Sequence, residues 1–309
     1  MSYDIYFHHD LDGIASAALI LNFLRSRGDS IENYFPLSYS PGLDWAARKF
    51  KNPAIVVDFQ YHPKAAIWFD HHATTFEKKR WKENFHRDKF HEWRPNYPSC
   101  LRIVLNALKR HFRFNPPQHL KELARWTDIV DQAKFKSARQ TIELKEPALQ
   151  LNAFIDHGIS YSDTKWLIEF LSKHHFRRVM AMPRVKRAIK IIRREISESL
   201  KFYKKNTRLF GRVALADLSK VRKLELRFAP YYLHPRILYS ISLKKRAKAF
   251  HLNLGINPWR KRENKIHIGR LLKRFGGGGH RVVGGAEFKT RKEALSAVKQ
   301  ILDILSRKS

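Results

Sequence analysis

Three short apolar runs in this chain each end where acidic residues or histidines begin. The runs are Tyr3–Phe7, Ala54–Val57 and Ala66–Phe69. The residues that follow them are His8-His9-Asp10-Leu11-Asp12-Gly13, Asp58 and Asp70-His71-His72. Such runs are typical of strands, and ligands of a parallel α/β sheet gather beyond the carboxyl ends of its strands. The pattern therefore predicts an α/β fold in which these polar side chains meet at one edge of a sheet.

The chemistry of these side chains indicates bound cations. Several carboxylates in one cleft would repel one another unless cations compensated their charge. Carboxylates with a few imidazoles suit Mn²⁺ or Mg²⁺ better than an ion that prefers thiolates. Two such ions roughly 3.5–4 Å apart are the usual arrangement for displacement at phosphorus. We therefore expect two divalent cations and a phosphate ester as substrate. Mn²⁺ is the preferred identity of both cations, and Mg²⁺ is the alternative.

A second motif is the run of four glycines at 276–279, which is followed by His280 and by a glycine pair at 284–285. Glycines expose backbone N–H groups and allow positive φ, so such a loop can approach an anion closely, and His280 could then donate to a phosphate or a base. A simple turn between a helix and a strand is the alternative. Four glycines in succession favour the ligand-binding loop.

At these residues the chain resembles the DHH phosphoesterase family. Five elements occur in the family's order: His8-x-Asp10-x-Asp12-Gly13, Asp58, Asp70-His71-His72, an acidic residue at Asp128 or Asp131, and Gly276-Gly277-Gly278-Gly279-His280. The family commonly has two alanines and a glycine where this chain has Val282-Val283-Gly284-Gly285. The resemblance implies a larger N-terminal domain with a mainly parallel sheet flanked by helices, a helical connector, and a smaller C-terminal α/β domain. The implied boundaries are 1–160, 161–205 and 206–309, with substrate binding of the DHHA1 type in the last.

The resemblance also implies a role for each site residue. The ligands of one ion would be His8, Asp10 and Asp58. The ligands of the other would be Asp12, Asp58, His71 and Asp131, with Asp128 as the alternative to Asp131. The expected catalytic set is Asp58, Asp70 and His72, in which His72 would orient the phosphate and Asp70 a ligand. The residues expected to hold the remote part of the substrate are Gly277, Gly278, Gly279, His280 and Arg281. The neighbour of His8, His9, could exchange roles with it.

The composition of the chain favours one class of substrate over others. The 309 residues include 61 Lys and Arg against 28 Asp and Glu, a formal net charge of +33, and 43% are hydrophobic, which argues for a globular protein. A generally basic proteome would give the same charge, and anionic membrane surface is a lesser possibility. Because such charge gains more from a chain of phosphates than from one nucleotide, we expect a hydrolase of short or single-stranded oligonucleotides, resembling exonucleases or nanoRNases. The alternatives are a phosphatase or phosphodiesterase for a small nucleotide, such as 3′-phosphoadenosine 5′-phosphate or a cyclic dinucleotide, and a nucleic-acid-binding protein without catalysis.

The single cysteine and the apolar segments bear on the location of the protein. Cys100 excludes an internal disulfide and is expected in a helix core. No apolar run approaches about 18 residues, and the N-terminus begins a strand without the apolar segment of a signal peptide. These features favour a cytoplasmic protein, either a monomer or a homodimer.

Several further elements follow from local patterns. Helices are predicted at Ile14–Leu24, Asp44–Phe50 and Cys100–Leu108, the last capped by Ser99, and a strand near Tyr34–Leu37. The stretch Phe76–Arg94 mixes aromatic residues with cations. It is either a solvated segment or a surface on which aromatic rings stack on bases.

Overall fold

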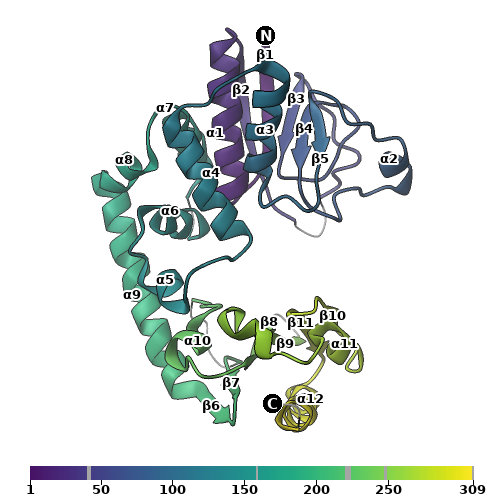
Figure 1. Ribbon diagram of the computed structural model, residues 1–309, viewed down its shortest axis with the longest axis vertical. Helices are drawn as coiled ribbons and strands as arrows, with labels where there is room; N and C mark the ends of the chain where they lie inside the picture. Colours follow the sequence, from purple (N-terminus) through teal and green to yellow (C-terminus); the bar gives the residue numbers. More distant parts are fainter. Residues whose placement is uncertain (40–42, 158, 220–223, 247–248, 308–309) are drawn as a thin grey trace. The chain divides into compact units, whose positions relative to one another are not determined.

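The apolar runs of the N-terminal half form a five-stranded, all-parallel sheet in the order β2-β1-β3-β4-β5 (Figure 1). Its strands are β1 (Ser2–His8), β2 (Ser30–Leu37), β3 (Ala54–Val57), β4 (Ala65–Asp70) and β5 (His91–Trp93). The four predicted strands are confirmed, and β5 is an addition within the aromatic stretch. Because all five strands run in one direction, their carboxyl ends share one edge of the sheet.

Helices flank this sheet. They are α1 (Leu11–Ser26), α2 (Lys79–Glu83), α3 (Cys100–Phe112), α4 (Gln118–Asp131), α6 (Pro147–Asp156), α7 (Tyr161–Lys173) and α8 (Phe176–Ala181). α1 begins directly after β1, because Asp10 caps it by accepting from the Gly13 amide (3.0 Å). A Cβ at Gly13 would lie 2.1 Å from the carbonyl oxygen of His8, so only glycine permits this turn. α3 begins as predicted, with the Ser99 hydroxyl accepting from the Arg102 amide (3.1 Å).

The predicted helix at Asp44–Phe50 is wrong, because these residues form only a turn. The Asp44 carboxylate accepts from the Ala47 amide (3.1 Å), and the chain does not continue into a helix. Trp45 instead inserts into the aromatic cluster on the sheet, where it is 1% exposed and donates its indole N–H to the Gln60 carbonyl (3.0 Å). Tertiary packing of one large side chain outweighs the local helical pattern.

The aromatic stretch packs inward. Phe85 and Phe76 lie against Trp68 of β4, with ring centroids 5.2 and 5.7 Å apart, and Trp81 is buried. Trp93 belongs to the same cluster. These rings therefore stabilise the first sheet, which accounts for them without stacked bases, while the cations between them remain at the surface.

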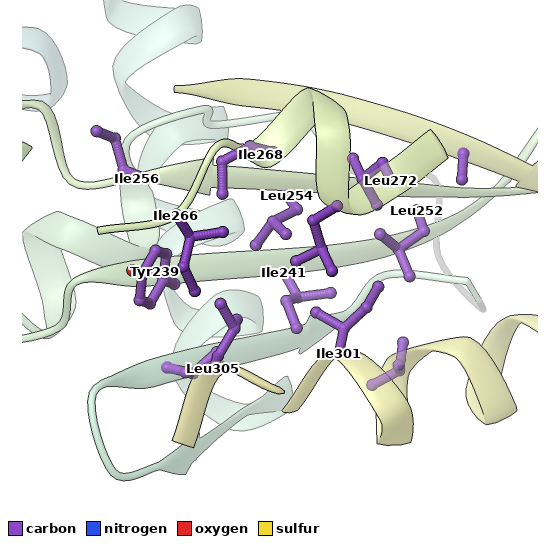
Figure 2. Close-up of a cluster of buried hydrophobic side chains, with 14 of the residues drawn as sticks. Tyr239, Ile241, Leu252, Leu254, Ile256, Ile266, Ile268, Leu272, Ile301 and Leu305 are labelled. Carbon is purple, nitrogen blue, oxygen red and sulfur yellow. The ribbon is translucent and has the colours of Figure 1, made fainter. Parts of the chain in front are cut away.

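The C-terminal half forms a six-stranded mixed sheet in the order β10-β11-β9-β8-β7-β6. The strands are β6 (Thr207–Phe210), β7 (Val213–Asp217), β8 (Tyr239–Arg246), β9 (Ala249–Ile256), β10 (Gly278–Gly279) and β11 (Val283–Phe288). The remaining helices are α5 (Ala138–Glu143), α9 (Pro183–Asn206), α10 (Ala229–Leu233), η1 (Pro258–Glu263), α11 (Ile268–Lys273) and α12 (Arg291–Ser306). In Figure 2, Ile241 and Leu254 from the strands pack with Leu272 of α11 and Ile301 of α12 to form the core of this half.

These features come from a computed structural model that describes residues 1–39, 43–157, 159–219, 224–246 and 249–307. The chain divides into two compact units: Met1–Phe135 with Leu144–Ile192, and Lys136–Glu143 with Arg193–Ser309. Helix α9 therefore begins in the first unit and ends in the second. The division at 160 and 205 into catalytic domain, connector and substrate domain stays a prediction. Among the described residues, no helix is long and apolar enough to cross a membrane.

Candidate metal centre

Asp58 lies at the centre of the polar cluster beyond the first sheet. It follows the last residue of β3 with a left-handed backbone (φ +57°), which is uncommon outside glycine and is found at functional sites. Its side chain is 1% exposed, yet neither carboxylate oxygen has a hydrogen-bond partner among the described residues. A buried carboxylate without a partner is costly, and a bound cation would remove that cost. The orphaned oxygens therefore fit a divalent cation.

One group of potential metal ligands joins Asp58 to the start of α1. His8 Nδ1 lies 2.7 Å from Asp10 Oδ2 and 3.8 Å from Asp58 Oδ2. Burial raises the pKa of the Asp10 carboxyl, but the hydrogen bond and charge of His8 together with the Gly13 amide outweigh burial, and the net shift is downward. His9 points elsewhere, with Nε2 3.3 Å from the Thr164 hydroxyl of α7. Of the two adjacent histidines, the structure brings His8 into the cluster.

A second group is formed by Asp12, His71 and Asp131, from three separate parts of the chain. His71 Nε2 lies 3.6 Å from Asp12 Oδ2, 3.5 Å from Asp58 Oδ1 and 3.7 Å from Asp131 Oδ2. Its Nδ1 lies 3.2 Å from the carbonyl oxygen of Tyr97, and a carbonyl can only accept, so the proton is on Nδ1. The Nε2 lone pair therefore faces the three carboxylates, as in a metal-ligating histidine.

Asp70 holds the two histidines that follow it. Its Oδ1 accepts from the His71 amide (2.8 Å) and lies 2.8 Å from His72 Nδ1. Burial lowers the pKa of His72, but the hydrogen bond to Asp70 and the surrounding carboxylates outweigh it, and the net shift is upward. His72 also lies 3.7 Å from Asp58 Oδ1 and is one third exposed. This geometry suits a histidine that is fixed at Nδ1 and presents its other nitrogen to a ligand.

The carboxyls at the centre have strongly raised pKa values in the metal-free protein. Burial is the largest cause for both Asp12 and Asp58, followed by repulsion from neighbouring carboxylates. The amides of Cys100 and Leu101 partly offset this for Asp12, at 2.6 and 2.9 Å. The cluster therefore concentrates more negative charge than the protein itself neutralises, which is the electrostatic condition of a cation site.

The two aspartates of α4 have different environments. Asp128 accepts from the Ser99 hydroxyl (2.6 Å) and from the Arg102 guanidinium (3.0 Å). Its charge is thus matched by α3, whereas Asp131 belongs to the group with His71. The structure brings Asp131 into the cluster and pairs Asp128 outside it.

Backbone hydrogen bonds and close packing hold the glycine run in the second unit. The Gly277 amide donates to the Leu272 carbonyl (3.0 Å), and the His280 amide to the Val283 carbonyl (2.8 Å). A Cβ at Gly279 would lie 2.4 Å from the Cα of Gly284. Close packing of β10 on β11 therefore explains part of the run. The side chains of His280 and Arg281 are exposed, and a Cβ at Gly276 or Gly278 would meet nothing within 4 Å, so these parts of the motif are open to a ligand.

The second unit also contains a cavity of about 410 Å³ between β8, β9 and the segment before α10. Aromatic, cationic and amide side chains line it, among them Phe228, Tyr231, Arg227, Lys261 and Asn253. This volume and mixed lining suit a ligand the size of a nucleotide. No pattern in the sequence indicates this cavity, because the lining residues are spread over several elements.

Sequence reasoning also missed Tyr39, whose ring lies beside His8 and His72 of the candidate metal centre. Its ring centroid is 5.2 Å from that of His8 and 6.2 Å from that of His72. Tyr39 follows β2, which pairs in parallel with β1. Strand order therefore puts it at the same edge as the acidic residues, a signal that requires knowing that β2 and β1 are neighbours.

No protein-family model and no curated protein matches the sequence. Several solved structures do resemble the fold over nearly the whole chain, including the following three. A pGpG-specific phosphodiesterase, PggH from Vibrio cholerae, superposes with a TM-score of 0.78 and 19% identity, covering 99% of this chain and 100% of that one. Exonuclease RecJ bound to manganese has a TM-score of 0.56 and 11% identity, covering 100% of this chain and 90% of that one. RecJ in complex with Mn²⁺ from Thermus thermophilus has a TM-score of 0.56 and 12% identity, covering 100% of this chain and 52% of that one.

Proposed function

We propose that this chain, which has the fold of the DHH phosphoesterases, is a metal-dependent phosphodiesterase of short oligonucleotides, with a linear dinucleotide as its smallest substrate. The observation that carries this proposal is the unpaired buried carboxylate of Asp58, which belongs to two groups of side chains that could hold a cation. One group contains His8 and Asp10, and the other contains His71 and His72; a third group joins His71 to Asp12 and Asp131. Asp58 and His71 would therefore each contribute to neighbouring cation sites.

The degree of structural similarity favours a short substrate. The pGpG-specific enzyme superposes with a TM-score of 0.78, whereas two RecJ exonuclease structures give 0.56. The described fold is thus more similar to an enzyme named for a linear dinucleotide than to these two exonucleases. The cavity in the second unit supports a nucleotide ligand rather than an inorganic phosphate.

Each group of site residues has a different role in the proposed hydrolysis. Bound divalent cations would supply an activated water and neutralise charge on the phosphoryl oxygens. His72, fixed by Asp70 at Nδ1, orients the scissile phosphate through its other nitrogen. Asp70 also holds the His71 amide, so one buried carboxylate sets the position of both histidines. In the second unit, the exposed side chains of His280 and Arg281 would contact a nucleotide ligand.

The test is hydrolysis of a substrate panel by the purified protein with Mn²⁺ and with EDTA. The panel contains a 5′-phosphorylated diribonucleotide, RNA and DNA oligomers of increasing length, 3′-phosphoadenosine 5′-phosphate and a cyclic dinucleotide. We expect cleavage of the diribonucleotide and the shortest oligomers with Mn²⁺ alone. Turnover of only 3′-phosphoadenosine 5′-phosphate or the cyclic compound would contradict the substrate class. Tight binding of oligomers without turnover would contradict catalysis altogether.

The two aspartates of α4 provide a matched pair for the ligand assignment. Asp131→Asn removes a proposed ligand, so we expect hydrolysis to fall by at least about a hundredfold. Asp128→Asn removes the partner of Arg102, so we expect a lower melting temperature with turnover largely retained. The opposite pattern in the two variants would assign Asp128 as the ligand.

A further inference from the structure

Tyr39 is an exposed aromatic residue in a unit that buries most of its large rings. It is 50% exposed, whereas Trp45, Phe59 and Trp68 nearby are at most 1% exposed. One face of the Tyr39 ring stacks on Phe59, with centroids 4.8 Å apart and planes inclined by 26°. Phe59 directly follows Asp58, so the stack is anchored beside the proposed bridging ligand.

The other ring contacts of Tyr39 are made at an angle. The His8 ring is inclined by 52° and the His72 ring by 67°, so neither stacks in parallel on the Tyr39 ring. Tyr39 stays half exposed although Phe59 covers one side of its ring, so part of its aromatic surface is open to solvent. Tyr39 therefore presents a flat aromatic surface at the mouth of the metal centre.

The hydroxyl of Tyr39 does not explain this placement. It has no hydrogen-bond partner among the described residues. A phenol buried only for packing would be covered on both faces, as the neighbouring rings are.

We propose that Tyr39 is the platform on which the nucleobase next to the scissile phosphate stacks. This inference rests on the proposed function and deepens it. A phosphate oriented by His72 carries its nucleoside within reach of a ring whose centroid is 6.2 Å away. Every base has an aromatic face, so stacking recognises a nucleotide without selecting one base. Tyr39 would thus distinguish nucleotides from phosphodiesters that lack a base.

The test measures binding, so it does not depend on turnover. The probe is a dinucleotide that carries 2-aminopurine and a methylene phosphonate linkage, which resists hydrolysis; stacking quenches 2-aminopurine fluorescence. With Mn²⁺, we expect the wild type to bind and quench the probe. Tyr39→Leu retains an apolar contact to Phe59 but has no aromatic face, so we expect a roughly 5- to 100-fold loss of affinity and no quenching. Tyr39→Phe and Tyr39→Trp should behave like the wild type.

Two controls make the result specific. Replacing 2-aminopurine with an abasic ribose should weaken binding to the wild type by the same factor as Tyr39→Leu does. The affinity of the Tyr39→Leu variant should be the same for the abasic probe and for the 2-aminopurine probe. Phe210→Ala removes another exposed aromatic residue, 44% exposed in the second unit, and should leave binding unchanged. Melting temperatures verify that each variant is folded.

The outcomes separate this inference from the proposed function. Equal affinity and quenching in the wild type and Tyr39→Leu would overturn stacking and leave hydrolysis standing. A loss in Tyr39→Phe as large as in Tyr39→Leu would assign the effect to the hydroxyl and also overturn stacking. A wild type that neither binds nor cleaves any nucleotide would overturn both proposals.

Discussion

The Asp-His-His segment and the glycine run are equally conspicuous in the sequence, but the fold treats their polar groups in opposite ways. Beyond the first sheet, both Asp58 oxygens and the Nε2 atom of His71 are buried without hydrogen-bond partners among the described residues. In the second unit, the amides of Gly277 and His280 donate to neighbouring carbonyls. Polar groups that the fold leaves unsatisfied thus indicate a ligand, whereas a motif whose groups are satisfied also has a structural explanation.

The largest expected effect is at Asp58. Asp58→Asn keeps a residue type that tolerates the left-handed backbone but removes the charge between the two ligand groups. Loss of the cations' charge stabilisation, several kcal/mol, should lower the hydrolysis rate at least about a thousandfold. The same change should raise the melting temperature in EDTA, because the raised pKa of Asp58 means that folding must either bury an unpaired charge or take up a proton at neutral pH. Kinetics and thermal unfolding check the two halves of this prediction.

An Asp58→Asn variant that is less stable than the wild type in EDTA would show that the carboxylate is satisfied by the protein itself. That result would remove the contrast between the metal centre and the glycine run, even if hydrolysis were lost.

The second effect concerns the glycine run. Gly279 has φ +139° and a Cβ there would meet Gly284, so Gly279→Ala should destabilise the protein by about 2–4 kcal/mol. Gly278→Ala meets open space and should cost less than about 1 kcal/mol. Denaturant unfolding measures both. If Gly278→Ala instead raises KM strongly at unchanged stability, this position contacts substrate; equal destabilisation in both variants would refute the packing explanation.

Mn²⁺ binding should release protons and tighten as pH rises. Asp12 and Asp58 have raised pKa values in the metal-free protein, first because of burial and then because of neighbouring carboxylates, and a cation must displace any proton they carry. Titration calorimetry in two buffers with different ionisation heats counts the protons. An affinity that is independent of pH would contradict a binding site built on these carboxyls.

The smallest effect is at Asp217, a satisfied carboxylate of the second unit. It pairs with Arg291 (2.6 Å) and accepts from Ser219; burial raises its pKa, but these hydrogen bonds outweigh burial and the net shift is downward. The folded pKa thus lies below the unfolded value, so the stabilisation is present above about pH 4 and is lost as pH falls through the folded pKa. Asp217→Asn should lower the free energy of unfolding by about 0.5–1 kcal/mol at neutral pH, with no difference in strong acid. A gain in stability would remove the contrast with Asp58.

Much of the first sheet and of its polar edge could be predicted from the sequence. Short apolar runs and the parallel-sheet rule place Asp58, His71 and Asp10 together without any knowledge of side-chain packing. The expected helix at Asp44–Phe50 failed because the burial of Trp45 is a tertiary effect.

Other parts of the site could not be predicted because they depend on contacts between distant elements. Asp128 and Asp131 lie three residues apart on one helix, and only the position of Arg102 on another helix distinguishes them. Tyr39 depends on the adjacency of β2 and β1, and on the stack with Phe59. Periodicity and spacing carry no information about such contacts.

The decisive experiment on the metal centre is a crystal structure of the protein grown with Mn²⁺, with anomalous diffraction measured at the manganese absorption edge. We predict two anomalous peaks that share Asp58, one also contacting His8 and Asp10, and the other also contacting His71, Asp12 and Asp131. Anomalous peaks only at other positions, or no peak in contact with Asp58, would contradict the two-metal centre on which the proposed function rests.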